Sequence, residues 1–511
     1  MRRPGVAWAG GILAAALSGC AVGPDFERPA PPDVQRYAAA PAAASTSGNE
    51  SVPAQRLHAG TDIPAQWWTL FRSPALDQLV RQALEHSPTL QQARARLLQA
   101  QEELRAQAGA RTLPSVDAEA SGARQKVDPS AYGIPVTELP PPFTLYNASI
   151  EVSYTLDVFG AERRAIEGLQ AQADHQQYEL QAARMMLAGN VVTTAIRQAG
   201  LQERLDAHRE LLAAQTRQLA ILRQRHHAGG VSALDVRRQE SLVAQARAEL
   251  PPLEQELDRA RHQLAVYLGQ LPSQAALPAL SLADLQLPLD VPLGVPSQLV
   301  RQRPDILAAE SLWRRATADA GVAAANRYPR FTLTGSFGSQ RTRAGDMADG
   351  VNVWNVALGL TQPLFRGGEL LARQRAAEAA LQGAAAAYRD TVLQGFQQVA
   401  DALRAVHADA ATLQAATEAD QQAEQAYRIT ERLYQAGGVS QLALLDARRE
   451  QWRTRAARVQ AQADRYADTA ALLQALGGGW WNEAESVSSP HPDASSSNCH
   501  ECAPAYAGPA N

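Results

Sequence analysis

Few side chains in this 511-residue sequence have the types and spacing that chemistry requires. Near the C-terminus, Cys499 and Cys502 stand two residues apart, a spacing that suits zinc. A structural zinc site needs about four ligands, and no matching second pair occurs elsewhere, so the motif indicates a disordered tail or an incidental disulfide. No nucleophile is paired with a base, and no phosphate-binding loop is present. We therefore expect no enzyme activity and no metal or cofactor.

Cys20 closes the tetrapeptide Leu17-Ser18-Gly19-Cys20, which resembles the lipobox of bacterial lipoproteins. It follows two arginines and an apolar stretch too short to span a bilayer, as in an export signal. The resemblance implies cleavage before Cys20, a diacylglyceryl thioether on its sulfur and an acyl chain on its amino group. The alternative is a secretory signal with a chance cysteine. Because Ala21 is not the aspartate that commonly retains lipoproteins in the inner membrane, outer-membrane sorting is implied.

Two glycine-containing segments repeat along the chain. Ala228–Ser232 recurs as Ala436–Ser440, 208 residues later. The glycine pairs, Gly229-Gly230 and Gly437-Gly438, predict helix C-caps, where glycine readily adopts the left-handed conformation. Ser232 and Ser440 then predict the N-caps of two returning helices. Each half of the sequence thus has the order helix, strand, loop, strand, very long helix, turn, returning helix.

Two acids follow these turns. Asp235 completes a capping box with Ser232, which is a sufficient structural reason for it. Asp446 lies six residues after Ser440 and has no such role. Under the repeat the two acids lie about one helical turn apart, on similar faces of equivalent helices.

Long helices and amphipathic strands must position these turns. Ser73-Pro74 and Ser87-Pro88 each predict an N-cap serine and a proline at the first helical position, before helices over Ala75–His86 and Thr89–Arg111. The proline-free stretches Ala161–His226 and Glu369–Gln435 predict helices about 100 Å long. Such helices need long packing partners. Period-2 alternation predicts four strands, over Ser115–Ser121, Tyr146–Leu156, Phe331–Phe337 and Val353–Thr361. A membrane barrel or a soluble half-buried sheet would give the same alternation. Four strands cannot close a barrel, so membrane strands would require several chains.

Composition excludes other classes. The net charge is −4, aromatic residues are 5% and Lys126 is the only lysine, which argues against a basic nucleic-acid binder. Three cysteines cannot build a disulfide framework for this length. Beyond the N-terminus no run of about 20 apolar residues predicts a membrane helix.

The chain resembles TolC-like outer-membrane efflux channels, in the lipoprotein (NodT-type) subgroup that serves resistance-nodulation-division (RND) pumps. The segments that carry the resemblance are Cys20–Phe26, Trp67–Phe71, Arg301–Ile306, Tyr328–Phe331, Pro363–Gly368 and the two Gly-Gly-Val-Ser turns. It implies a mixed α/β membrane channel, a homotrimer with four strands per chain in one 12-stranded barrel. A long periplasmic α-helical barrel continues this transmembrane barrel. The implied segments are a signal peptide (1–19), a lipidated extended segment (20–66), a first repeat (67–271), a linker (272–296), a second repeat (297–481) and a disordered tail (482–511).

The resemblance also implies site roles. Two tips, Gly229, Gly230, Val231 and Ser232 with Gly437, Gly438, Val439 and Ser440, would meet a periplasmic membrane-fusion adaptor. Asp446, with Asp235 and Tyr434, would form the periplasmic gate. An exposed acid in the outer wall is the alternative for Asp446, and simple burial the alternative for Tyr434. Arg303-Pro304-Asp305 is interpreted as a helix start.

Three functions are compatible with these features. The favoured one is an outer-membrane exit duct that passively conducts small toxic compounds or drugs from an inner-membrane RND pump and its adaptor. The second is a duct of the same fold for a type I protein secretion system. The third is a coiled-coil surface lipoprotein without a channel, against which the strands argue. The substrates are not encoded in any motif.

We predict that Cys20 carries lipid. Metabolic labelling with palmitate should mark the wild-type protein and leave a Cys20→Ala variant unlabelled, because the sulfur and the new amino group are the acyl acceptors. Equal labelling of the two proteins would contradict the prediction.

Overall fold

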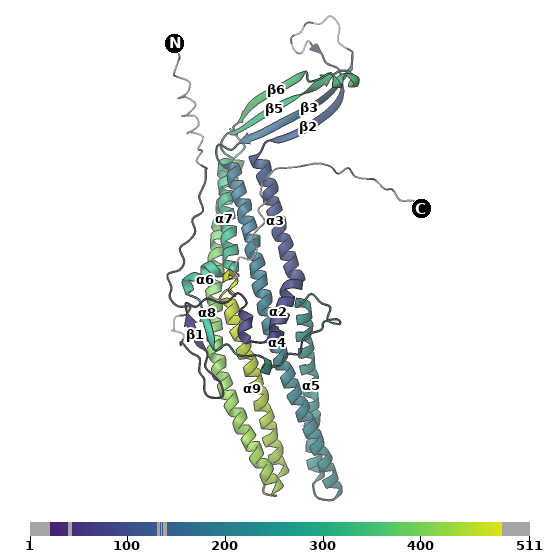
Figure 1. Cartoon of the computed structure of the whole chain (residues 1–511), viewed down its shortest axis with the longest axis vertical. Coiled ribbons are helices and arrows are strands. Elements are labelled where there is room, and N and C mark those ends of the chain that lie inside the picture. The colour runs from purple at the N-terminus through teal and green to yellow at the C-terminus, as the bar shows by residue number, and fades with distance from the viewer. Residues whose placement is uncertain (1–20, 39–42, 130–132, 134, 136–140, 483–511) are drawn as a thin grey trace, which may run out of the picture.

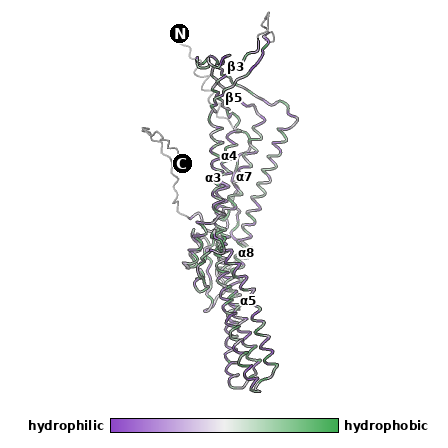
Figure 2. The backbone as a smooth tube through the Cα atoms, turned by 90° about the vertical axis from the view of Figure 1, so that its right-hand side faces the viewer, coloured by the Kyte–Doolittle hydropathy of each residue, from purple (hydrophilic) through white to green (hydrophobic). Residues whose placement is uncertain are grey.

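The computed structural model describes residues 21–38, 43–129, 133, 135 and 141–482, so Cys20 and the predicted disordered tail lie outside the described residues, apart from Asn482. The chain forms a long bundle of helices with a sheet at one end (Figure 1). Seen from the side, the sheet and the helical tips lie at opposite ends of the bundle (Figure 2). The elements in chain order are β1 (Arg56–Ala59), η1 (Trp67–Phe71), α2 (Pro74–His86), α3 (Pro88–Thr112), β2 (Ser115–Gln125), β3 (Phe143–Leu156), α4 (Ala161–His227), α5 (Ala233–Tyr267), η3 (Leu282–Asp284), β4 (Asp290–Leu293), α6 (Pro296–Gln302), α7 (Pro304–Ala325), β5 (Arg330–Arg341), η4 (Ala344–Ala348), β6 (Val353–Thr361), α8 (Glu369–Gln435), α9 (Gln441–Ala475) and η5 (Trp480–Asn482).

The four predicted strands are confirmed, and three are longer than the alternation indicated. They form one antiparallel sheet in the order β2-β3-β5-β6. β2 continues to Gln125 and β5 to Arg341, because the strand pairing extends past the residues that alternate clearly. The outer edges of β2 and β6 have no strand partner within the described chain.

The two very long helices are also confirmed. α4 and α8 have 67 residues each, and each turns back into a 35-residue helix, α5 or α9. α3 packs on α4, and α7 packs on both α4 and α8, so the upper bundle has neighbours along its length. α5 stays continuous through Pro251 and Pro252. Within the described ranges, none of the helices combines the length and apolar character needed to cross a membrane.

The main core lies around the middle of the bundle, where α2, η1 and the chain after α5 pack against α4 and α9. Its largest buried side chains include Trp67, Phe71, Leu76, Leu79 and Ile196. These residues share one apolar cluster with Leu472 and Leu473 of α9. The middle of the bundle therefore joins the two helical hairpins, while the ends depend on pairwise helix contacts.

Helix starts follow the predicted proline pattern with one correction. Ser73 accepts a hydrogen bond from the Leu76 amide, as an N-cap should. Ser87 makes no side-chain cap bond to α3; it is also the C-cap of α2, where its amide donates to the Ala83 carbonyl. Arg303, before Pro304, contributes more than a helix start: it is buried and donates to Asp305 and to the Ala475 carbonyl, which ties α7 to α9.

The N-terminal segment contains more structure than the extended segment predicted for residues 20–66. β1 pairs in parallel with β4, more than 200 residues away. Before it, Thr46, Val52 and Gln55 are buried. The sequence prediction missed this because the partners of the segment are distant in sequence and the segment itself has no regular period.

We predict that Gly269→Ala destabilises the middle of the bundle. Gly269 has φ +71°, and a Cβ there would lie 2.7 Å from the His86 carbonyl oxygen. Left-handed strain in a non-glycine residue costs on the order of 1–3 kcal/mol, so the thermal unfolding midpoint in detergent should fall. The matched control is Gly109→Ala in α3, where a Cβ meets nothing within 4 Å and the midpoint should hold or rise. An unchanged midpoint for Gly269→Ala would contradict the close packing at this turn.

Candidate functional site

The lower ends of the two hairpins form the predicted tips. At the first, Gly229 has φ +77° and the Gly230 amide donates to the Arg225 carbonyl at 2.8 Å. At the second, Gly437 has φ +78° and the Gly438 amide donates to the Leu433 carbonyl at 2.8 Å. Only the first glycine of each pair is left-handed, which corrects the prediction for Gly230 and Gly438. The second glycine of each pair closes the turn through its amide.

The cap serines behave as predicted. Ser232 Oγ accepts from the Asp235 amide at 3.2 Å, and Asp235 Oδ2 accepts from the Ser232 amide at 3.2 Å, which is a capping box. Ser440 Oγ accepts from the Ala443 amide at 3.2 Å. The hydrogen bonds from Ser232 lower the pKa of Asp235 below its ordinary value, so this carboxylate stays charged, and its cap persists, until the solution becomes strongly acidic.

The tips are exposed. Gly229, Gly230, Ser232, Gly437, Gly438 and Ser440 all lie open to solvent, and Val231 and Val439 are half-buried. Open backbone in two neighbouring turns, with short side chains, allows another protein to approach closely.

Tyr434 joins the two hairpins. Its hydroxyl accepts a hydrogen bond at 2.8 Å from Nη1 of Arg225, and the guanidinium lies 6.0 Å from the ring centre. Arg225 belongs to α4 and Tyr434 to α8, so the contact crosses from one tip to the other. Sequence reasoning missed Arg225, because its only signal is its position one turn before the first tip.

The two acids make separate contacts. Asp235 is engaged by its own cap, whereas Asp446 is exposed, with 55% of its side chain accessible, and pairs with Arg449 at 3.5 Å. Asp446 is therefore free of any burial or capping role within one chain. Its assignment to the gate stays a prediction.

The sheet at the other end separates apolar from polar residues by face. Two adjacent rows across its four strands are Val116, Val152, Gly335 and Val356, and then Asp117, Glu151, Ser336 and Asn355. Neighbouring rows point to opposite faces of a sheet. On the apolar face Trp354, Val356 and Leu358 are 77%, 69% and 65% exposed. These large apolar side chains are open to solvent in the single chain.

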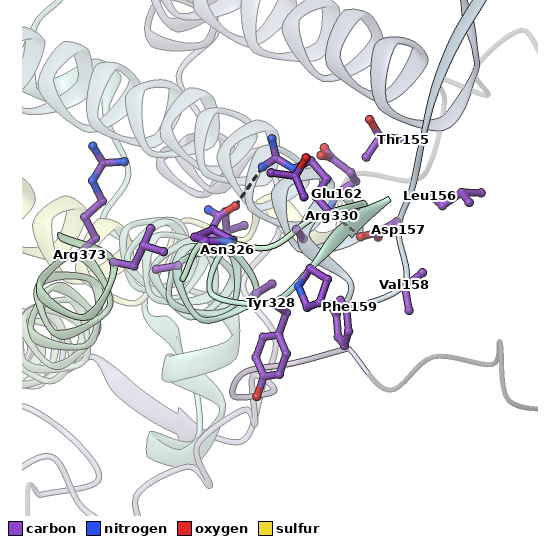
Figure 3. A pocket seen from close by; sticks show the side chains of 18 of the residues that line it. Thr155, Leu156, Asp157, Val158, Phe159, Glu162, Asn326, Tyr328, Arg330 and Arg373 are labelled. Atoms are coloured by element: carbon purple, nitrogen blue, oxygen red, sulfur yellow. Dashed lines mark hydrogen bonds between the residues drawn. The ribbon is translucent and has the colours of Figure 1, made fainter. Parts of the chain in front are cut away.

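Where the sheet meets the helices, Asp157 caps the start of α4. Its carboxylate accepts from the Glu162 and Arg163 amides at 3.1 and 2.9 Å, and Glu162 pairs with Arg111 of α3. The Phe159 and Tyr328 rings stack at 4.8 Å beside a cavity of about 430 Å³ (Figure 3). Polar and charged groups line most of this cavity, so it gives no enclosed apolar ligand site.

The first described residues are fixed at this junction. The Val22 amide donates to the Phe159 carbonyl at 3.1 Å, and Ala21 lies directly against Gly160, whose added Cβ would be 2.8 Å from that of Ala21. The segment then follows α7, where Phe26 packs edge-on against Trp313 at 5.3 Å and Arg28 pairs with Glu310 at 2.7 Å.

A sheet with one apolar face and open edges, at the end of a long helical bundle, is the architecture of an outer-membrane channel subunit. The solved outer-membrane channel OprN superimposes with a TM-score of 0.78 at 28% identity, over 90% of this chain and 100% of that one. A family model described as outer membrane efflux protein matches residues 79–270 and 295–478. The chain therefore belongs to the outer membrane efflux protein family.

Named relatives agree with this assignment. The outer membrane protein OprJ of Pseudomonas aeruginosa is 31% identical over 481 residues, which cover 94% of this chain and 97% of OprJ. The pyoverdine export outer membrane protein OpmQ of Pseudomonas putida is 32% identical, over 86% of this chain and 92% of OpmQ. The resemblance found in the sequence is confirmed at the level of the family and its outer-membrane location.

Proposed function

We propose that this protein is the outer-membrane exit duct of a tripartite efflux system and works as a homotrimer. The observation that carries the proposal is the sheet, which exposes an apolar face and two open edges to whatever surrounds a single chain. A lipid-exposed strand edge is not tolerated, and the smallest known membrane barrels have about eight strands. Three chains give one closed barrel of twelve strands, four from each chain. The apolar face then meets lipid and the polar face lines a water-filled lumen.

The tips support the periplasmic half of the proposal. They lie at the end of the bundle opposite the sheet, where Gly229–Ser232 and Gly437–Ser440 present open backbone (Figure 1). In the proposed assembly these turns dock a periplasmic membrane-fusion adaptor, which links the duct to an inner-membrane RND pump. The helical bundle is then the periplasmic conduit, with neither a catalytic step nor a bound cofactor.

The anchor is part of the same proposal. Ala21, which would follow a lipidated Cys20, lies where the sheet meets the helices, the level expected for the periplasmic surface of the outer membrane. Acyl chains on the preceding residue would therefore enter the adjacent leaflet without stretching the segment. Several acyl chains make a stable anchor, where a single one is marginal.

Small molecules are the proposed cargo, because the relative OpmQ is named for pyoverdine export and the family is described by efflux. The protein secretion alternative would require protein cargo, and no feature of the chain favours it. A susceptibility panel of drugs and toxic compounds on a deletion strain would identify the substrates. If the deletion strain were no more sensitive than its parent strain to any compound of the panel, this would argue against the efflux assignment.

We place the gate at Asp446, with Asp235 and Tyr434 as its neighbours in the closed tip. Three copies of an exposed acid near the trimer axis repel one another unless they are hydrated or balanced by cations. Such a ring attracts cations and repels anions at the mouth of the pore. The Arg225–Tyr434 hydrogen bond would hold the two hairpins of one chain together in that state.

The test is single-channel recording in a planar bilayer under a salt gradient. The wild-type protein should give discrete conductance steps with a cation-selective reversal potential and block by multivalent cations. Asp446→Asn should lower the selectivity and weaken the block with little effect on the trimer. Asp235→Asn should change selectivity less and destabilise the tip slightly, because a neutral amide oxygen accepts from the Ser232 amide more weakly than the carboxylate does.

Two outcomes would count against these assignments. Absence of conductance steps in the wild type would contradict the duct. Steps with unchanged selectivity and block in Asp446→Asn would show that Asp446 does not face the lumen.

A further inference from the structure

The residues between Ser45 and Arg56 form a closed loop that the proposed duct does not require. Ser45 and Arg56 pair as an isolated bridge, and the Thr46 amide donates to the Gln55 carbonyl at 2.9 Å. Inside the loop, Asn49 Oδ1 accepts from the Ser51 and Val52 amides at 3.0 and 2.8 Å. We name residues Thr46–Gln55 the N-terminal strap. Its hydrogen bonds give it a defined shape despite the absence of a helix or strand.

Arg465 of α9 fixes the two ends of the strap. Its side chain is 0% exposed and donates to the Pro53 carbonyl at 2.8 Å and to Gln55 Oε1 at 3.2 Å, with a longer bond of 3.4 Å to Thr46 Oγ1. All three acceptors are neutral oxygens of the strap. A buried guanidinium that loses such acceptors is left without compensation, so the strap and α9 hold each other in place.

The strap also reaches α8. Val52 is 3% exposed and packs in one apolar cluster with Leu413 of α8 and Ala461 of α9. Nearer the tip, Nε2 of Gln421 donates to Ser51 Oγ at 3.3 Å. The strap therefore bridges both helices of the hairpin that carries Tyr434 and Asp446.

The strap contacts the hairpin between the core and the tip, where it can limit the movement of the tip. Gln421 precedes Gly437 by sixteen residues, about 24 Å of helix. Beyond it α8 and α9 meet in pairwise contacts, such as that of the Arg448 guanidinium with the Tyr427 ring, whose centre lies 5.2 Å away. A bridge at this level limits how far α8 and α9 can slide or splay.

We propose that the N-terminal strap is a conformational restraint on the α8–α9 hairpin that opposes opening of the periplasmic tip. The gating part of this inference rests on the proposed duct function, whereas the restraint itself does not.

The restraint is tested first by hydrogen exchange on the full-length protein in bilayers. Val52→Asp places a charge in the buried contact and should release the strap. Backbone amides of α8 between Leu413 and Gln435 should then exchange about tenfold faster than in the wild type. The matched control is Val34→Asp, the same change in the same segment at a side chain that is 43% exposed, and it should leave these rates unchanged.

A second experiment tests gating in the opposite direction. Ser51→Cys and Gln421→Cys, both at exposed positions, are joined by a short bifunctional maleimide in a Cys499→Ser/Cys502→Ser background. The linked channel should open less often than the same protein carrying Ser51→Cys alone, and Val52→Asp should open more often than the wild type.

The outcomes separate this proposal from the duct. Unchanged exchange in Val52→Asp, with a native sheet and helix content, would overturn the restraint whatever the conductance. Equal opening of linked and unlinked channels would overturn the gating role while wild-type conductance steps still support the duct. Faster exchange together with a wild type that conducts nothing would preserve the restraint and reject the duct.

Discussion

The structure depends on an apolar sheet face that the chain itself does not cover. Leu358 and Val356 are exposed, on a four-stranded sheet whose outer edges have no partner in the described residues. Alternation of apolar and polar residues along the strands requires a non-aqueous environment for the apolar face, and open sheet edges require further strands. Lipid and two more copies of the chain satisfy both requirements at once. In the proposed homotrimer the rest of the fold has to keep three sheets in register, and helices that begin directly at the strand ends would do so.

The long helices transmit that arrangement to the other end of the molecule. Helices of 67 residues have no stability of their own at this composition and need continuous neighbours. The buried cluster around Trp67, Phe71 and Leu472 supplies a fixed middle, and the buried Arg303 ties α7 to α9 at the same level. Below this middle the tips are held by contacts within each hairpin, by the strap, by the Arg455–Glu210 ion pair and by the Arg225–Tyr434 hydrogen bond. The molecule is therefore most easily deformed where the proposed gate lies.

Local chemistry explains what could be predicted from the sequence. Prolines at helix starts, glycine at helix ends and period-2 alternation are properties of neighbouring residues, so α4, α8 and both tips were predicted almost to their ends. All four strands were located, although β2, β3 and β5 extend three or four residues further than predicted. The capping box of Ser232 and Asp235 was likewise predictable. The missing parts depend on distant partners: Arg465 binds a segment about 410 residues earlier, and Arg225 meets Tyr434 across 209 residues. No periodicity marks such pairs. Ser87 is the opposite case, because a motif of neighbouring residues predicted a side-chain cap that is not formed. Ser87 precedes α3 as predicted, but it also ends α2 and makes no cap bond.

The most direct test of the account is the accessibility of alternate residues along β6 in the membrane-embedded protein. Single cysteines at 355–360, in a background without Cys499 and Cys502, are treated with a membrane-impermeant maleimide. We predict labelling at Asn355, Ala357 and Gly359, which would face the lumen, and protection at Val356, Leu358 and Leu360, which would face lipid. Equal labelling of both sets would contradict a membrane barrel, and with it the proposed duct.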